Sequence, residues 1–262
     1  MTAPIPATGA PAPRARAIPC LALLVLAVAV PAAAQRPEMP PVAYPAIAAR
    51  AERPADFVPE GWRLEHLARG HLDTDDVEDA VLLLRMDDAR NVVDNAGLGP
   101  DEFDTNPRML VAAFAEPGGG FRRALADHAL IPRPENPVLD DVLDSDPAEA
   151  VRIDSARRSL SVRLHSWASA GTWFTRNVVF TFRHQDGCFR LIGYDDSELH
   201  RASLETREAS ANYLTGRAWT REGSAEKDEP GPKRWTRFDA SEPVCLERIG
   251  DGFAFRSAAA AD

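Results

Sequence analysis

The stretch Leu160–Tyr194 reads LSVRLHSWASAGTWFTRNVVFTFRHQDGCFRLIGY, and it decides the fold. Its three runs are rich in β-branched and aromatic residues, and two polar breaks that contain glycine separate them. The dipeptide Asp186-Gly187 is typical of a two-residue hairpin turn, because both residue types tolerate positive φ. In the middle run, the apolar residues of one strand face recur at alternate positions: Phe174, Val178, Phe180 and Phe182. The stretch therefore predicts an antiparallel meander.

Strand-like runs continue on both sides of this meander. Short turns join them and no alternation of strands with helices is visible, which favours antiparallel pairing. We therefore expect a mostly β fold of antiparallel meander sheets, arranged as stacked sheets or as an incomplete propeller-like array, with few short helical turns. The further runs are Trp62–Ala68, Ala80–Leu84, Met109–Phe114, Phe121–Leu130, Arg207–Arg221, Trp235–Phe238 and Val244–Ile249.

Polar segments lie between these runs. Asp87–Asn106 contains two glycines and a proline and is predicted to be a long surface loop. Asp195–Thr206 is predicted to be a polar connection with a short turn of helix.

The first 34 residues have the features of an export signal. Arg14 and Arg16 give a positive start, Ala17–Val30 is a short apolar run, and the three alanines at 32–34 suit cleavage before Gln35. The apolar run is shorter than the roughly 20 residues that a membrane-spanning helix needs. We therefore predict a periplasmic or secreted protein with no membrane span after signal cleavage.

Composition sets limits on the partners of the mature chain. The whole chain has 30 basic and 40 acidic side chains, and loss of the two arginines in residues 1–34 leaves a net charge of −12. Such an acidic chain argues against nucleic acid as a partner.

Two cysteines, Cys188 and Cys245, remain after signal cleavage, and in an oxidising compartment they are expected to form one disulfide. The alternative is two separate buried thiols.

The mature chain divides by composition. Residues 35–56 are rich in proline and alanine and are predicted to form an extended tether. Residues 57–255 are long enough for a single β-rich domain with a sizeable core. Residues 256–262 are expected to be a flexible tail.

An acidic turn between Trp62–Ala68 and Ala80–Leu84 gives the clearest chemical signal. Asp73, Asp75 and Asp79 alternate, with Val77 between the last two. Alternate positions of a tight loop direct their oxygens to one centre, as a hard cation such as Ca²⁺ requires. The segment resembles the single calcium loop of FG-GAP and VCBS repeats, whose pattern is D-x-D/N-x-D-G-x-x-D between two strands. The resemblance implies that the ligands are Asp73, Asp75, the Val77 carbonyl and Asp79.

This loop departs from the pattern at two positions. His71 replaces the first acid, and Asp76 replaces the glycine of the sharp bend. Fewer carboxylates lower the attraction for the cation, and a side chain at the bend adds strain. We therefore expect weak calcium binding, or a solvated acidic turn that holds no ion.

The runs Phe182–Asp195 and Ala209–Trp219 are similar to those of a group of uncharacterised bacterial secreted proteins. Members of that group also carry an upstream strand–acidic loop–strand segment. The resemblance covers most of residues 62–219 and implies an order of elements, but it implies no catalytic residue.

Candidate catalytic groups are few. His165 and Ser166 are neighbours on a predicted strand, so their side chains diverge. No nucleophile elbow, metalloprotease motif or nucleotide-binding loop is present. Paired carboxylates for glycoside chemistry are available in principle from Asp195, Asp196 and Glu198, although such acids are more often solvated.

Two classes of function stay open. The sequence favours an exported binding or accessory protein of unknown protein or glycan ligand, and Trp167 and Trp173 are candidates for a sugar-binding platform as well as for the core. The alternative is a secreted hydrolase, for example one acting on glycans, whose residues converge only in three dimensions.

Overall fold

The computed structural model describes residues 1–2, 37–227 and 229–257. The chain divides into two units, Met1–Ala33 and Ala34–Asp262, and every element discussed below belongs to the second unit. The predicted cleavage site before Gln35 and nearly all of the predicted signal peptide lie outside the described residues. In the described part of the chain, no helix has both the length and the apolar character needed to cross a membrane.

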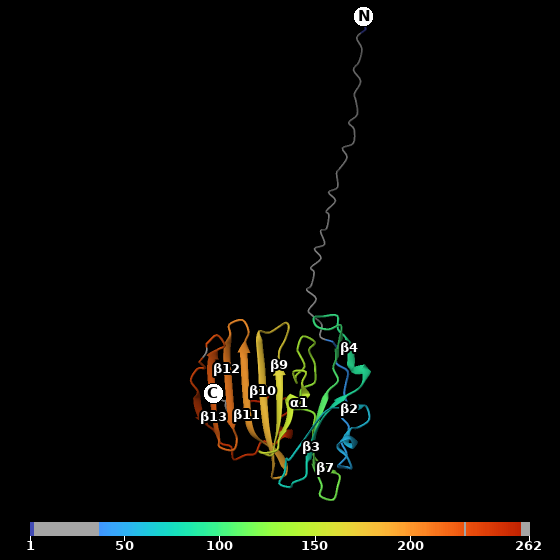
Figure 1. Cartoon of the computed structure of the whole chain (residues 1–262). Coiled ribbons are helices and arrows are strands. Elements are labelled where there is room, and N and C mark those ends of the chain that lie inside the picture. The colour runs from blue at the N-terminus through green and yellow to red at the C-terminus, as the bar shows by residue number, and fades with distance from the viewer. Residues whose placement is uncertain (3–36, 228, 258–262) are drawn as a thin grey trace. The chain divides into compact units, whose positions relative to one another are not determined.

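The predicted meander forms the centre of a seven-stranded antiparallel sheet (Figure 1). Its turn at Asp186 and Gly187 has φ values of 51° and 82°, and Gln185 pairs with Cys188, as expected for a two-residue hairpin. The strands follow one another in chain order: β8 (Val151–Asp154), β9 (Ser159–Ser166), β10 (Phe174–Gln185), β11 (Cys188–His200), β12 (Glu205–Asn212), β13 (Arg217–Ser224) and β14 (Arg234–Arg237).

A five-stranded antiparallel sheet has the order β1-β7-β6-β3-β2. Its strands are β1 (Arg50–Ala51), β2 (Trp62–Gly70), β3 (Asp79–Met86), β6 (Arg108–Ala115) and β7 (Phe121–Asp127). The central strand β6 is buried on both faces, and so are the first six residues of β3, which explains their continuous rather than alternating apolar runs.

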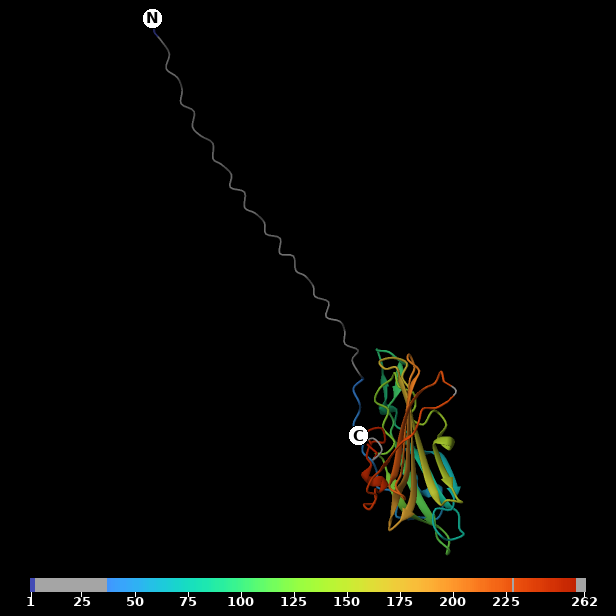
Figure 2. The same ribbon diagram turned by 90° about the vertical axis from the view of Figure 1, so that its left-hand side faces the viewer.

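One hydrophobic core joins a face of each sheet. Phe114 of β6 stacks on Phe189 of β11, with ring centroids 6.2 Å apart. The segment after β14 lies along the same face of the seven-stranded sheet (Figure 2), where the ring of Phe255 contacts Phe180 and Tyr194 at 5.6 and 5.3 Å. Complete burial of a side chain such as Phe180 contributes about 1.5–3 kcal/mol. The predicted mostly β, antiparallel fold is confirmed.

The predicted tether joins the β-structure earlier than the sequence indicates. Ile47 is buried against the far face of the five-stranded sheet, and β1 pairs with β7. A short 3₁₀ turn at Pro54–Phe57 (η1) follows and buries Phe57. Proline and alanine can line a sheet surface without making regular structure, so composition alone did not separate this segment from a linker.

Three predicted segments differ in detail. The predicted loop Asp87–Asn106 contains a 3₁₀ turn (η2, Ala89–Asn91) and a small hairpin of β4 (Val92–Asp94) and β5 (Glu102–Asp104). The polar run after Tyr194 continues β11 as far as His200, because cross-strand pairs with β10 and β12 support it. Val244–Ile249 is mainly a 3₁₀ turn (η3, Leu246–Arg248) and not a strand. The remaining helix, α1, covers only Pro147–Ala150.

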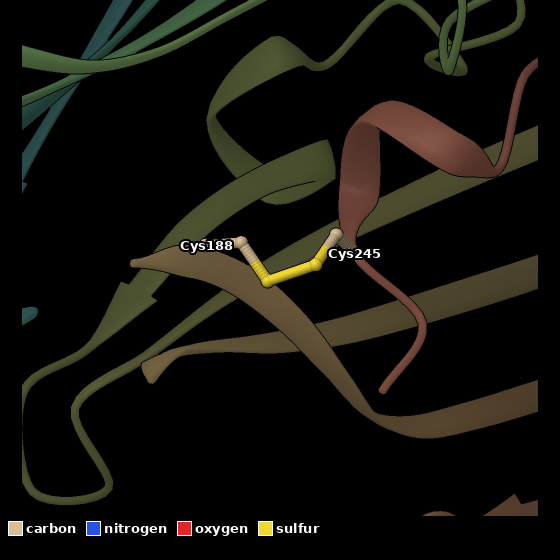
Figure 3. The surroundings of a disulfide bond; sticks show 2 residues. All are labelled: Cys188 and Cys245. Carbon is tan, nitrogen blue, oxygen red and sulfur yellow. A yellow bond between two sulfur atoms is a disulfide. The ribbon is translucent and has the colours of Figure 1, made fainter. Parts of the chain in front are cut away.

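The predicted disulfide joins Cys188 to Cys245 (Figure 3), with a Cα–Cα distance of 5.8 Å. It links the start of β11 to the residue that precedes η3, where the backbone of Arg190 pairs with that of Cys245. The disulfide thus fastens the segment after β14 to the centre of the large sheet.

Candidate functional site

The acidic loop lies between β2 and β3, and its last acid is a structural group. Asp79 is fully buried at the start of β3. Its Oδ2 accepts a hydrogen bond from the Leu72 amide at 2.8 Å, and its Oδ1 accepts one from the Ala115 amide at 3.0 Å. Burial raises the pKa of Asp79, and the two amides offset this only in part. Asp79 therefore closes the loop onto β6.

The other predicted ligands are engaged inside the loop. Asp73 Oδ1 accepts a hydrogen bond from the Asp75 amide at 3.0 Å, and Asp75 Oδ1 accepts one from the Val77 amide at 2.9 Å. The Val77 carbonyl lies 3.2 Å from His71 Nδ1. Over the described ranges, no three His, Cys, Asp or Glu side chains gather so as to hold a metal ion. Calcium binding at this loop stays a prediction.

A cavity of about 710 Å³, here called the hairpin cavity, lies beside the β4–β5 hairpin. Segments that are distant in sequence form its walls: Tyr44, the hairpin residues 102–104, residues 128–142, the end of β9, and Phe253 after β14. Sequence reasoning missed this cavity, because no local pattern marks the meeting of these segments.

The wall of the hairpin cavity includes part of a buried network of ion pairs. Arg108, which is 3% exposed, donates two hydrogen bonds to Glu65 and two to Asp141, at 2.6–2.9 Å. Although burial alone lowers the pKa of Arg108, these hydrogen bonds raise it above its ordinary value. Arg85 donates to Asp104 at 2.8 Å, and its Nε is buried without a partner. This network ties the wall of the cavity to strands β2, β3 and β6.

The lining of the hairpin cavity combines aromatic and acidic groups. The Tyr44 and His128 rings lie 4.0 Å apart, and Phe103 and Phe253 add apolar surface. Tyr44 is half-buried, and burial raises its pKa. Four carboxylates on the lining have no ion-pair partner among the described residues: Glu102, Glu135, Asp140 and Asp251.

One cation on the lining, Arg133, is already hydrogen-bonded to other groups of the protein. The guanidinium of Arg133 donates to the Pro40 and Thr105 carbonyls and to the Asn91 and Thr105 side chains, at 2.6–3.1 Å. Burial lowers the pKa of Arg133, and the nearby charge of Glu135 opposes that shift. The lining therefore carries an excess of negative charge.

The candidate catalytic groups are not brought together. His165 Nδ1 lies 3.0 Å from Asn177 Oδ1, and no hydrogen bond joins His165 to Ser166. A different contact, which sequence reasoning missed, joins Ser203 Oγ to His200 Nδ1 at 2.8 Å. The Ser203 amide also donates to that nitrogen, and the hydroxyl has a second acceptor in Glu205. This exposed contact closes the turn between β11 and β12.

The candidate carboxylates after Tyr194 lie on one strand, with alternate residues on opposite faces. Asp196 and Glu198 face the same side of β11, and Asp195 faces the other. Asp196 accepts two hydrogen bonds from Arg176, at 2.9 and 2.7 Å. This pair is therefore a structural ion pair on the sheet.

The candidate sugar platform has a cation over its rings. Trp173 is 62% exposed, but the guanidinium of Arg201 lies over both Trp167 and Trp173, 4.6 and 5.9 Å from the ring centroids. Arg217 lies over Trp235 in the same way. Such cation–π contacts occupy aromatic surface that a sugar would otherwise cover.

No protein-family model, curated protein or solved structure matches this chain.

Proposed function

We propose that this is an exported binding protein whose hairpin cavity holds a small organic cation with an apolar body. The observation that carries the proposal is the composition of the cavity. Aromatic and proline side chains line a space of about 710 Å³. The same lining carries Glu102, Glu135 and Asp140, which have no ion pair among the described residues, and Asp251, whose Oδ1 accepts hydrogen bonds from two backbone amides.

Size and polarity both support this ligand class. Small-molecule sites usually have volumes of roughly 300–1,000 Å³ and combine apolar walls with a few orienting polar groups. An amine or quaternary ammonium group gains from unpaired carboxylates and from nearby aromatic faces, where a cation–π contact contributes about 0.5–2 kcal/mol. Anions are disfavoured because the two arginines of the described lining, Arg85 and Arg133, are bound to protein groups.

The contacts of the two histidines on the cavity lining, His128 and His165, favour binding over hydrolysis. The His128 ring lies tilted against Tyr44, and His165 contacts an amide oxygen, so neither histidine has a carboxylate partner among the described residues to orient it as a base. A hydrolase needs such a pairing of nucleophile and base, or of two acids, within reach of one substrate.

Export and calcium binding are separate parts of the proposal. The sequence of residues 1–34 supports export, and the disulfide is in keeping with an oxidising compartment. Weak calcium binding rests on the resemblance of the acidic loop alone.

Isothermal titration calorimetry with three ligands of similar shape tests the cavity. Phenethylamine is cationic at neutral pH, 2-phenylethanol is neutral, and 3-phenylpropanoate is anionic. We expect the amine to bind at least tenfold more tightly than the alcohol, and the anion to bind least.

Substitutions locate the binding. Glu102→Gln and Asp140→Asn should each weaken amine binding about three- to tenfold, whereas Glu226→Gln, a matched change away from the cavity, should leave it unaltered. Equal affinity for all three ligands, or insensitivity to both cavity substitutions, would contradict the proposal.

A further inference from the structure

A second hollow, here called the charged cleft, lies on the seven-stranded sheet and has a volume of about 690 Å³. Strands β10–β14 form its floor, and Arg256 lines it from the segment after β14. Its lining includes four arginines and three acids: Arg176, Arg207, Arg234, Arg256, Asp196, Glu198 and Glu222. The charged cleft is thus slightly basic in a chain of net charge −10.

The charges of the cleft alternate across the sheet. Arg176 of β10 is in register with Glu198 of β11, Glu198 with Arg207 of β12, and Arg207 with Glu222 of β13. Arg234 of β14 adds the next positive charge, 3.4 Å from Glu222. Neighbouring strands lie roughly 4.8 Å apart, so the backbone positions that carry the arginines and acids alternate at about that spacing.

These groups do not neutralise one another completely. Arg176 is turned to Asp196, with a 2.7 Å contact from its Nη2, and Arg207 leans to Glu222 at 4.0 Å. Both arginines in register with Glu198 thus pair with other acids, and the half-buried Glu198 has no ion pair or hydrogen bond within the part of the chain that the structure describes.

Elsewhere in the cleft, guanidinium groups outnumber the carboxylates that they pair with. Arg207 and Arg234 share the single carboxylate of Glu222, and Arg256 has no partner in the described ranges. One hollow therefore presents an unpaired carboxylate together with guanidinium groups that have unused donors.

We propose that the charged cleft binds a small zwitterion of the amino acid and short-peptide class. Glu198 accepts hydrogen bonds from the ligand ammonium, and Arg256, with the pair that shares Glu222, donates to the ligand carboxylate. Glu198 lies on β11, whereas Arg207 and Arg234 lie on β12 and β14, so a ligand that lies across the strands meets a carboxylate at one end and guanidinium groups at the other. The volume leaves room for the side chains of a few residues. The lining of this second site shares no residue with that of the hairpin cavity.

Calorimetry with the tripeptide Ala-Ala-Ala tests the charged cleft. We expect the unmodified peptide to bind at least tenfold more tightly than its N-acetylated form and than its C-terminal amide. Glu198→Gln should weaken binding of the unmodified peptide about tenfold and abolish the preference for a free amino group. Arg256→Gln should weaken binding about tenfold and abolish the preference for a free carboxylate. Its side chain is exposed and has no partner among the described residues, so we expect this variant to fold normally.

Controls separate this site from other sources of binding. Glu226→Gln and Arg69→Gln repeat the chemical changes at exposed positions outside the cleft, and Glu102→Gln repeats one in the hairpin cavity; none should change tripeptide affinity. The proposal fails if Ala-Ala-Ala does not bind at millimolar concentration. It also fails if the N-acetylated form binds better, which indicates an anion site, or if Glu102→Gln is the variant that weakens binding.

Discussion

A single guanidinium, that of Arg108, neutralises two carboxylates in the interior of the β-structure. Replacement by alanine leaves Glu65 and Asp141 mostly buried without their main cation. Breaking a buried pair in this way typically costs about 3–5 kcal/mol. We therefore expect Arg108→Ala to lower the free energy of unfolding by that amount, measured by urea denaturation at pH 7. Arg90→Ala, which removes an exposed pair with Asp88, should have a far smaller effect, because solvent screens such a pair.

The effect of Arg108 also depends on pH. Burial tends to raise the pKa of Asp141, but the hydrogen bonds from Arg108 outweigh it and lower the pKa. A lowered pKa contributes stability above the unfolded value of about 4, and that contribution is lost as the pH falls through the folded value. The difference between the natural protein and Arg108→Ala should therefore be largest near neutrality and shrink in acid. A constant difference down to about pH 3 would contradict the assignment.

The backbone of one turn residue provides another prediction. Gly187 has φ of +82°, which a residue with a side chain adopts at a cost of roughly 1–2 kcal/mol. Gly187→Ala should destabilise the protein by that amount in the same assay. Gly118→Ala is the control, because Gly118 also has no atom within 4 Å of an added Cβ but does not require left-handed geometry. Equal effects of the two substitutions would show that the turn does not constrain the fold.

At the scale of the elements, substitutions in the acidic loop test whether its resemblance to calcium loops extends to calcium binding. His71→Asp with Asp76→Gly restores the two positions at which the pattern is broken. The natural loop should bind Ca²⁺ weakly, in the range of about 10⁻⁴–10⁻³ M, or not at all, and the double variant should bind it more tightly. Adding Asp73→Asn to the double variant should reverse the gain. If calorimetry shows no improvement in the double variant, the loop is not a calcium motif.

The elements also show what the sequence could predict. The Asp186-Gly187 turn and the alternation in β10 are local signals, so the central hairpin was predictable. The continuation of β11 to His200 depends on pairing with strands on both sides and leaves no local apolar pattern. The hairpin cavity was not predictable for a related reason, because its lining combines Tyr44, the β4–β5 hairpin and Phe253. The charged cleft was not predictable either, because only the pairing of the strands brings acids and arginines that are distant in sequence into one row.

At the scale of the whole molecule, the disulfide links the segment after β14 to the start of β11. Cys188 and Cys245 are 57 residues apart, and in the chain-entropy model a loop of this length contributes about 4 kcal/mol. Cys188→Ser with Cys245→Ser should lower the free energy of unfolding by up to this amount. Free-thiol titration of the unreduced, denatured natural protein should find no reactive thiol in the mature chain, and two reactive thiols would contradict a stable disulfide.

Processing is the second prediction for the whole molecule. The positive start, the apolar run and the alanines before Gln35 predict cleavage at that residue. Intact mass spectrometry of protein recovered from the periplasm or medium should therefore give a chain that begins at or near Gln35. Recovery of a full-length chain from the membrane fraction would contradict this prediction.

The position of Phe255 in the core has a consequence for the order of events during synthesis. This ring contacts Phe180 and Tyr194 on the large sheet, yet it is translated after every strand of that sheet. Until it arrives, the hairpin of β10 and β11 has an incomplete apolar cover, and contacts between such distant residues form slowly. The large sheet therefore acquires its complete apolar cover only after its last strand and the segment that follows it have been synthesised.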